Sequence, residues 1–157
     1  MLHSAVVAHK TDGFMFLGPS NAGKTTLATM SASIGCAVLG DEHNFIIPDQ
    51  GIGYVLTAAP SIKRFPVGYS ERRPPLGGIF RLVQDKTNFL VSIPPIEIAK
   101  TLFDAFMETP PGPLLSDELL ARAFGIMGDI ARRTPGYELH FCKSPDFWDV
   151  IDAEFGM

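Results

Sequence analysis

Eight consecutive residues near the start of the chain have the types and spacing that bind a polyphosphate. Gly18-Pro19-Ser20-Asn21-Ala22-Gly23-Lys24-Thr25 matches the Walker A pattern Gly-x-x-x-x-Gly-Lys-[Ser/Thr] at every fixed position. Glycines let the backbone curl so that successive N–H groups point at phosphate oxygens, and the lysine adds a positive charge for the outer phosphates. The hydroxyl of Thr25 suits a Mg²⁺ ion. The pattern predicts a phosphate-binding loop (P-loop) for a nucleoside triphosphate.

The segments on either side of the loop support this interpretation over a glycine-rich turn with an incidental lysine. The apolar run Gly13–Leu17 predicts a strand before the loop, and Lys24–Ser33 favours a helix that stops near Gly35. The amino end of a helix attracts anions through its dipole and its unpaired N–H groups. We therefore expect the nucleotide to be bound by loop and first-turn residues, namely Gly18, Ser20, Asn21, Ala22, Gly23, Lys24, Thr25 and Thr26.

Two acidic residues follow the next apolar segment. Cys36–Leu39 predicts a short buried strand, and Asp41 and Glu42 come directly after it. Strand ends of α/β sheets meet the phosphate loop, and phosphoryl transfer needs a carboxylate for the metal or for the acceptor's proton. We expect Asp41 to be the main functional carboxylate and Glu42 to be a second metal ligand, the alternative being a solvated turn. Arginines 64, 72 and 73 are candidates for neutralising transferred phosphate, or else part of a solvated loop.

The strand that enters the loop is expected to form a hairpin with the strand before it. Leu2–Ala8 is apolar and β-rich, His3 lies near its start, and Lys10-Thr11-Asp12-Gly13 carries the Asp-Gly turn signal. Antiparallel entry is unusual, because most P-loop proteins enter the loop from a parallel sheet with βα crossovers. Short strands are also expected over residues 44–47 and 53–57, and a second hairpin is expected between Leu76–Gln84 and Asn88–Ile93.

The second half of the chain is expected to be mostly helical. A proline at the first helical position predicts a helix over Pro95–Met107, and the N-cap signal of Ser116 predicts another that ends at Arg133. A strand is expected over Tyr137–Cys142, followed by a short helix that buries Trp148 and Ile151. This order predicts a mixed α/β fold with substantial antiparallel pairing.

Length and composition set limits on the class of protein. The 157 residues predict one nucleotide-binding domain over residues 1–157, with 46% hydrophobic and 19% charged residues. A net charge of −4 argues against a general nucleic-acid-binding protein. No apolar run is long enough to span a bilayer and no secretory signal is recognised, so we expect a cytoplasmic protein with no membrane partner. Cys36 and Cys142 are expected to be buried thiols.

These motifs together resemble a known family. His3-Ser4-Ala5-Val6-Val7, the Asp-Gly turn, the segment Phe16–Leu27 and Leu39-Gly40-Asp41-Glu42 are similar to the catalytic domain of HPr kinase/phosphorylase, and most similar to compact HPr-kinase-related proteins. The resemblance implies the nucleotide-binding fold of phosphoenolpyruvate carboxykinase, in which antiparallel strands enter the P-loop. This sequence departs from the family at Glu42, where the family usually has Asp. It also lacks the downstream glycine-rich signature of the true HPr kinases. Those differences argue against HPr itself as the acceptor.

The resemblance also implies an activity. It implies an ATP- and Mg²⁺-dependent kinase that transfers the γ-phosphoryl group to a hydroxyl, expected to be a serine of a small protein or peptide. Lys24 would bind the β- and γ-phosphates, Thr25, Asp41 and Glu42 would serve the metal, and Asp41 and His3 would join Lys24 in catalysis. A homo-oligomer is implied, since related kinases assemble as multimers. The alternatives are a nucleotide-binding regulatory module without transfer chemistry and, less favoured, a small-molecule kinase.

Overall fold

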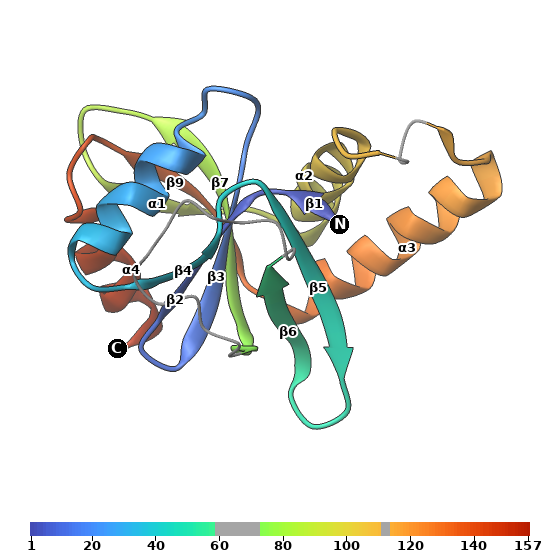
Figure 1. The fold of residues 1–157 in the computed structure, drawn as a ribbon, viewed down its shortest axis with the longest axis horizontal. Helices are drawn as coiled ribbons and strands as arrows, with labels where there is room; N and C mark the ends of the chain where they lie inside the picture. The colour runs from blue at the N-terminus through green and yellow to red at the C-terminus, as the bar shows by residue number, and fades with distance from the viewer. Residues whose placement is uncertain (59–72, 111–113) are drawn as a thin grey trace.

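The computed structural model describes residues 1–58, 73–110 and 114–157, and in these the protein has a mixed α/β fold (Figure 1). A six-stranded sheet lies at its centre. Its strands, in spatial order, are β4 (Ala37–Gly40), β2 (Ala5–His9), β3 (Asp12–Leu17), β7 (Leu76–Gln84), β9 (Gly136–Phe141) and β8 (Phe89–Ser92). The expected mixture of parallel and antiparallel strands is confirmed.

The strand directions bring four carboxyl ends to one edge of this sheet. β3 and β7 are parallel, and so are β7 and β9. β2 is antiparallel to both of its neighbours, β3 and β4, so β4 runs in the same direction as β3. The carboxyl ends of β3, β4, β7 and β9 therefore lie along the same edge, where an α/β sheet places its ligand.

The hairpin that leads into the glycine-rich loop is confirmed, but its turn is not at Asp12-Gly13. His9 pairs with Asp12, which leaves Lys10 and Thr11 as the turn, with Lys10 at a φ of 53°. Gly13 instead lies in β3, where an added Cβ would come within 2.8 Å of Leu56 Cδ1 and Pro74 Cγ. The absence of a side chain at Gly13 therefore serves close packing, which a local turn signal does not distinguish.

The second expected hairpin, between Leu76–Gln84 and Asn88–Ile93, is wrong. Both segments are strands, but β9 lies between them and pairs in parallel with β7 and antiparallel with β8. Leu139 and Phe141 of β9 are buried, whereas Phe89 and Val91 of β8 are exposed. β9 therefore occupies an interior position, and β8 forms the edge of the sheet.

The first residues of the chain belong to a second sheet, which corrects the expected placement of His3. β1 (Leu2–His3), β5 (His43–Asp49) and β6 (Gly53–Ala58) form an antiparallel sheet in which His3 pairs with His43. The chain changes sheets at Ser4, which is buried. The Asn44 side-chain amide donates to the Ser4 carbonyl at 2.8 Å and to its hydroxyl at 3.0 Å. These bonds hold β1 against β5 rather than in line with β2.

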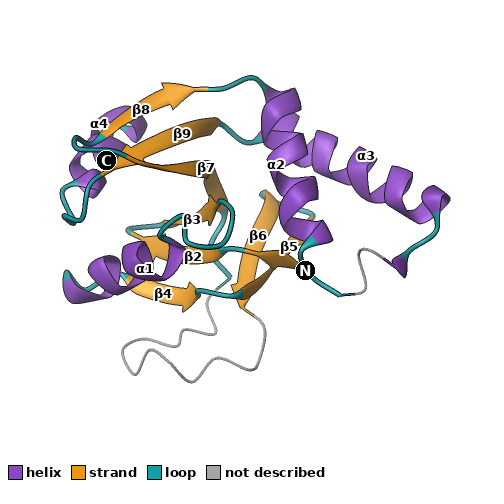
Figure 2. Ribbon diagram, turned by 90° about the horizontal axis from the view of Figure 1, so that it is seen from above, coloured by secondary structure: helices purple, strands orange, loops and turns teal. Residues whose placement is uncertain are grey.

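Four helices in the described residues cover the two faces of the large sheet (Figure 2). Alternate residues of β3 point to opposite faces. Phe14 and Phe16 pack with α1 (Lys24–Ser33) and α4 (Phe147–Phe155), which contributes the buried Trp148 and Ile151. Met15 and Leu17 pack with α2 (Pro95–Met107) and α3 (Asp117–Arg133). Burial of each such large side chain contributes about 1.5–3 kcal/mol, so both faces hold β3 and the loop after it.

The helix boundaries follow the expected signals. α1 spans the expected Lys24–Ser33, α2 begins with Pro95, and the Ser116 hydroxyl caps α3 by accepting from the N–H of Leu119. None of the described helices has the length and apolar composition needed to cross a membrane. Both thiols are free, but only Cys36 is buried, since Cys142 is partly exposed at the end of β9.

Candidate functional site

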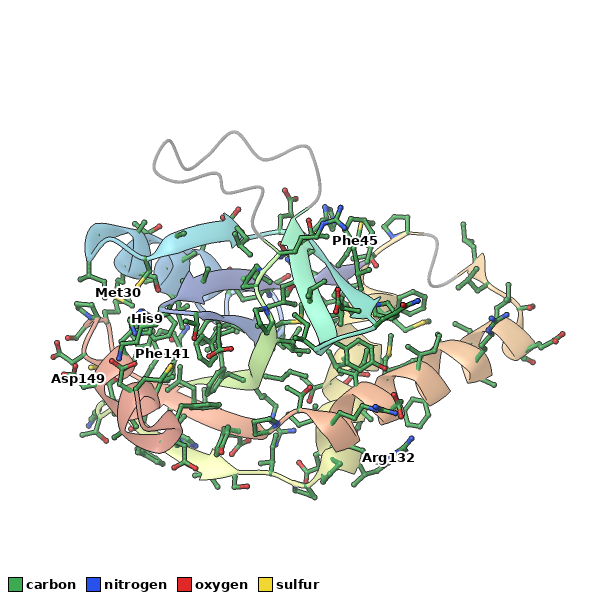
Figure 3. The ribbon with its side chains drawn as sticks, turned by 90° about the horizontal axis from the view of Figure 1, so that it is seen from below. His9, Met30, Phe45, Arg132, Phe141 and Asp149 are labelled. Atoms are coloured by element: carbon green, nitrogen blue, oxygen red, sulfur yellow. The ribbon has the colours of Figure 1, made fainter. Side chains whose placement is uncertain are left out.

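The backbone of the segment from Gly18 to Gly23 curls in a way that demands glycine at its last position. Gly23 has a φ of 105° and precedes α1 directly. A Cβ on Gly23 would lie 2.6 Å from Cζ of Phe141, which belongs to the core cluster beneath α1 (Phe141 is labelled in Figure 3). Both the backbone conformation and the space available exclude a side chain at this position.

The amino end of α1 is suited to an anion. In α1, all of whose residues are described, no side chain caps the first turn and no acidic residue lies within it. The first N–H groups of a helix have no partner inside the helix, and the dipole places partial positive charge there. With Lys24, Thr25 and Thr26 as its first residues, this end of α1 combines backbone donors, a cation and two hydroxyls.

The ammonium group of Lys24 is turned back onto the loop. Its Nζ donates to the carbonyl oxygens of Gly18 at 2.6 Å and of Pro19 at 3.1 Å, and the residue is buried. Burial lowers the pKa of Lys24 below its ordinary value, and the nearby Glu108 carboxylate partly offsets this. Since a charged phosphate accepts a stronger hydrogen bond than a carbonyl does, the ammonium favours an anion over its present partners.

A polar cavity of about 470 Å³ opens at this end of the sheet. The loop and the start of α1 line it with Ser20, Asn21, Gly23, Lys24, Thr25 and Thr26. The rest of the lining includes His3, Asp41, Gln84 and Lys143. Asp41 follows β4, Gln84 ends β7 and Lys143 follows β9, so this lining comes from the strand ends that the topology brings together.

The structure brings most of the predicted site residues together. His3 and Asp41 line the same cavity as the loop, and Asp41 is buried. Three residues are placed elsewhere: Gly18 borders an adjacent cavity, Ala22 packs against the core, and Glu42 is exposed and does not line the polar cavity. Arg73 is exposed before β7 and does not line it either. The predictions for residues 64 and 72 lie outside the described residues.

Three residues of this region were missed from the sequence. Gln84 donates from Nε2 to the carbonyl of Asn21 at 2.8 Å, which ties β7 to the loop, and Lys143 adds a second cation to the cavity. Both lie at strand ends, so the argument that identified Asp41 could have found them. Glu108, at the end of α2, binds Nδ1 of His3 at 2.6 Å. No local pattern in the sequence indicates that contact.

The donor set of the cavity fits a hard divalent cation held together with a phosphate. The Thr25 hydroxyl and the Asp41 carboxylate are both oxygen donors on the same cavity. Mg²⁺ is held by one or two such protein groups with water and substrate phosphate, rather than by a full protein cage. The described residues contain no group of three or more His, Cys, Asp and Glu that could hold a metal by themselves.

Comparisons with known proteins do not name a family. No family model matches this chain, and no curated protein matches it.

Proposed function

We propose that this protein is a cytoplasmic ATP- and Mg²⁺-dependent kinase related to HPr kinase, which transfers the γ-phosphoryl group to a seryl hydroxyl of a small protein or peptide. The observation that carries the proposal is the convergence of the Lys24 loop, Asp41 and Lys143 on one cavity at the amino end of α1. The antiparallel hairpin of β2 and β3 supports a P-loop fold of the HPr kinase and phosphoenolpyruvate carboxykinase type.

The chemical type of each residue in the cavity indicates its role in phosphoryl transfer. The loop N–H groups and Lys24 bind the β- and γ-phosphates and stabilise the charge that spreads over the transferred group, and Lys143 adds to that positive potential. Thr25 and Asp41 would hold Mg²⁺, which when bound neutralises phosphate charge. Gln84 keeps the loop in its curled form through its bond to the Asn21 carbonyl.

The proposal is tested by comparing Lys24→Ala with Arg122→Ala, a change to an exposed cation on α3. Calorimetric titration with Mg–ATP is expected to show binding by the parent protein and a loss of about 10²-fold or more in Lys24→Ala, because the cation facing the phosphates is gone. Arg122→Ala should bind as the parent does. A parent protein without affinity for Mg–ATP or Mg–GTP contradicts the proposal.

Transfer is measured separately from binding. Incubation with γ-labelled ATP and seryl peptides is expected to label the peptides with the parent protein and not with Lys24→Ala. Tight binding without transfer would instead favour a non-catalytic nucleotide-binding module. One observation favours this second candidate. Glu42 is exposed, so Asp41 is the carboxylate in the described lining of the cavity.

A further inference from the structure

A second cavity, of about 350 Å³, borders the first two residues of the loop, Gly18 and Pro19. Its other walls come from β7 and α2. They include Arg81, Lys100, Thr101, Asp104 and Glu108. The loop therefore contributes to both cavities, with its later residues on the polar cavity at α1 and its first residues on this one.

The two cavities are joined by a hydrogen-bonded pair. His3 lines the first cavity, Glu108 lines the second, and His3 Nδ1 lies 2.6 Å from Glu108 Oε2. The Lys24 ammonium lies at the same boundary, because it donates to the carbonyls of Gly18 and Pro19.

The end of α2 holds Glu108 in place. The N–H of Glu108 donates to the Asp104 carbonyl at 3.1 Å, and the Thr109 hydroxyl lies within hydrogen-bond distance of the carbonyls of Phe106, at 2.8 Å, and Met1, at 3.2 Å. These contacts hold in place the two chain segments that carry His3 and Glu108.

The pair has the arrangement of a base with an orienting carboxylate. An ionised carboxylate is only an acceptor, so this hydrogen bond requires the proton on Nδ1 of His3, and a neutral ring then has its lone pair on Nε2. A carboxylate that fixes the tautomer of a histidine in this way makes the other ring nitrogen a base.

We propose that the second cavity is the acceptor subsite of this enzyme, and that Glu108 is a positioning residue that holds His3 as the base; this inference rests on the function proposed above. The proton of the acceptor hydroxyl passes to Nε2 of His3, and the acceptor oxygen forms a bond to the γ-phosphorus of ATP. The bond from that phosphorus to the β,γ-bridging oxygen breaks, and its electron pair leaves with ADP. In this assignment Asp41 and Thr25 would hold the metal rather than take part in the proton transfer.

The charges of the second cavity indicate the class of acceptor. Arg81 is already paired, at 2.9 Å with Glu97 and 2.7 Å with Glu138. Lys100 and Asp104, one turn apart on α2, line the cavity and form no ion pair with each other in the described structure. A cation and an anion so placed complement a ligand with charges of both signs. The volume is near the lower limit of ligand cavities, which suits a free amino acid or a short extended segment around one serine.

The subsite is tested by filling it. Thr101→Phe places a ring in the second cavity from the half-buried surface of α2. Transfer from γ-labelled ATP is measured to two probes, free L-serine and a degenerate library of seryl pentapeptides with charged neighbours. We expect unchanged Mg–ATP affinity and at least about a tenfold loss of transfer to whichever probe the parent protein labels. Undiminished transfer overturns the subsite and leaves the kinase assignment intact, whereas a parent protein that labels neither probe overturns both.

The role of Glu108 is tested with Glu108→Ala, Glu108→Gln and, as a control, Glu118→Ala, which changes an exposed glutamate on α3. Loss of the orienting group is expected to lower kcat for transfer by about 10²-fold without changing the KM for ATP. Glu108→Gln, whose amide oxygen still accepts from Nδ1, should recover part of that loss. Equal kcat values in Glu108→Ala and the parent protein overturn the inference.

A spectroscopic measurement separates positioning from structure and needs no acceptor. Nitrogen-15 NMR of the His3 ring should show the proton on Nδ1 in the parent protein and Glu118→Ala, and a shift toward Nε2 protonation in Glu108→Ala. A proton on Nε2 in the parent protein overturns the inference. Spectra are recorded at one fixed pH, since several ionisable groups face His3 from neighbouring elements: Glu108, His43, Lys24, Asp41 and Lys143.

Discussion

A histidine bonded to a carboxylate lies near each end of the β2–β3 hairpin, His9 within β2 at the turn end and His3 in β1, just before β2, at the loop end, but their surroundings differ. At the loop end, His3 meets Glu108 at 2.6 Å beside the polar cavity. At the turn end, His9 Nε2 meets Asp152 of α4 at 2.9 Å, and Lys10 donates to the same carboxylate at 2.8 Å. The same pair of groups thus occurs near both ends of the hairpin, once in each sheet.

At the turn end, the His9 ring is surrounded by other protein side chains. His9 Nδ1 lies 3.3 Å from the Cys36 sulfur, and the ring packs on Trp148 with centroids 4.4 Å apart. Cys36, His9 and Asp152 have the connectivity of a nucleophile, a base and an orienting acid. However, burial and then the charge of Asp152 raise the pKa of the Cys36 thiol, which opposes formation of the thiolate. This cluster stabilises the fold, whereas the groups at the loop end face a cavity.

The comparison teaches that a hydrogen-bonded histidine and carboxylate do not by themselves define a site. In the described residues both ring nitrogens of His9 contact protein groups, whereas His3 has a hydrogen-bond partner only at Nδ1. Substitutions at the loop end should therefore change ligand binding, and those at the turn end should change the free energy of unfolding.

The largest effect is expected from Gly23→Ala, compared with Gly35→Ala at the other end of α1. Both glycines have positive φ, 105° and 89°, but an added Cβ meets Phe141 at 2.6 Å only at Gly23 and meets nothing within 4 Å at Gly35. Gly23→Ala should lose about 10²-fold in Mg–ATP affinity and about 2–3 kcal/mol of stability, against about 1 kcal/mol for Gly35→Ala. Calorimetry and urea unfolding measure the two effects, and equal behaviour of the variants contradicts the packing argument.

Asp41→Asn should weaken the binding of Mg–ATP by about 10–100-fold, because a metal-binding carboxylate loses its charge. ATP titrated in the presence of EDTA provides the internal control and should bind both proteins alike. If metal-free and metal-bound ATP lose affinity equally, Asp41 acts on the nucleotide by another route than the metal.

At the turn end, Asp152→Asn should lower the free energy of unfolding by about 1–2 kcal/mol and leave Mg–ATP affinity unchanged. Burial raises the pKa of Asp152, but hydrogen bonds from Lys10 and His9 outweigh this and leave it below its ordinary value. A lowered pKa in the folded state gives stability that is present above the unfolded value, about 3.9, and is lost as the pH falls through the folded value. The difference in stability should thus be full at pH 7 and vanish in strong acid, as measured by urea unfolding at several pH values.

The smallest effect is expected from Gln84→Ala, which removes the bond from β7 to the Asn21 carbonyl. One exposed hydrogen bond is worth about 0.5–1.5 kcal/mol, so Mg–ATP affinity should fall by about threefold. Thr87→Ala, in the exposed turn that follows β7, is the matched control. A loss greater than that in Asp41→Asn would mean that Gln84 contacts the nucleotide itself.

Short-range signals in the sequence determined much of this protein. The strand before the loop, the bounds of α1, the proline start of α2 and the Ser116 cap of α3 all follow from residues within a few positions of one another. Backbone preference and capping act over that range, so they can be identified without knowledge of the fold. The proximity of Asp41 to the loop was also accessible, because it needed only one helix and one strand between them.

Only the tertiary structure decided which distant segments meet. The insertion of β9 between β7 and β8, the pairing of β1 with β5, and the meeting of Glu108 with His3 each join residues far apart in the chain. These pairings depend on which distant segments together bury the most apolar surface. No local sequence pattern contains that information. The sequence therefore predicted a loop with Asp41, Glu42 and His3 beside it, while the packing of the whole molecule left Glu42 exposed, added Gln84 and Lys143, and brought Glu108 to His3.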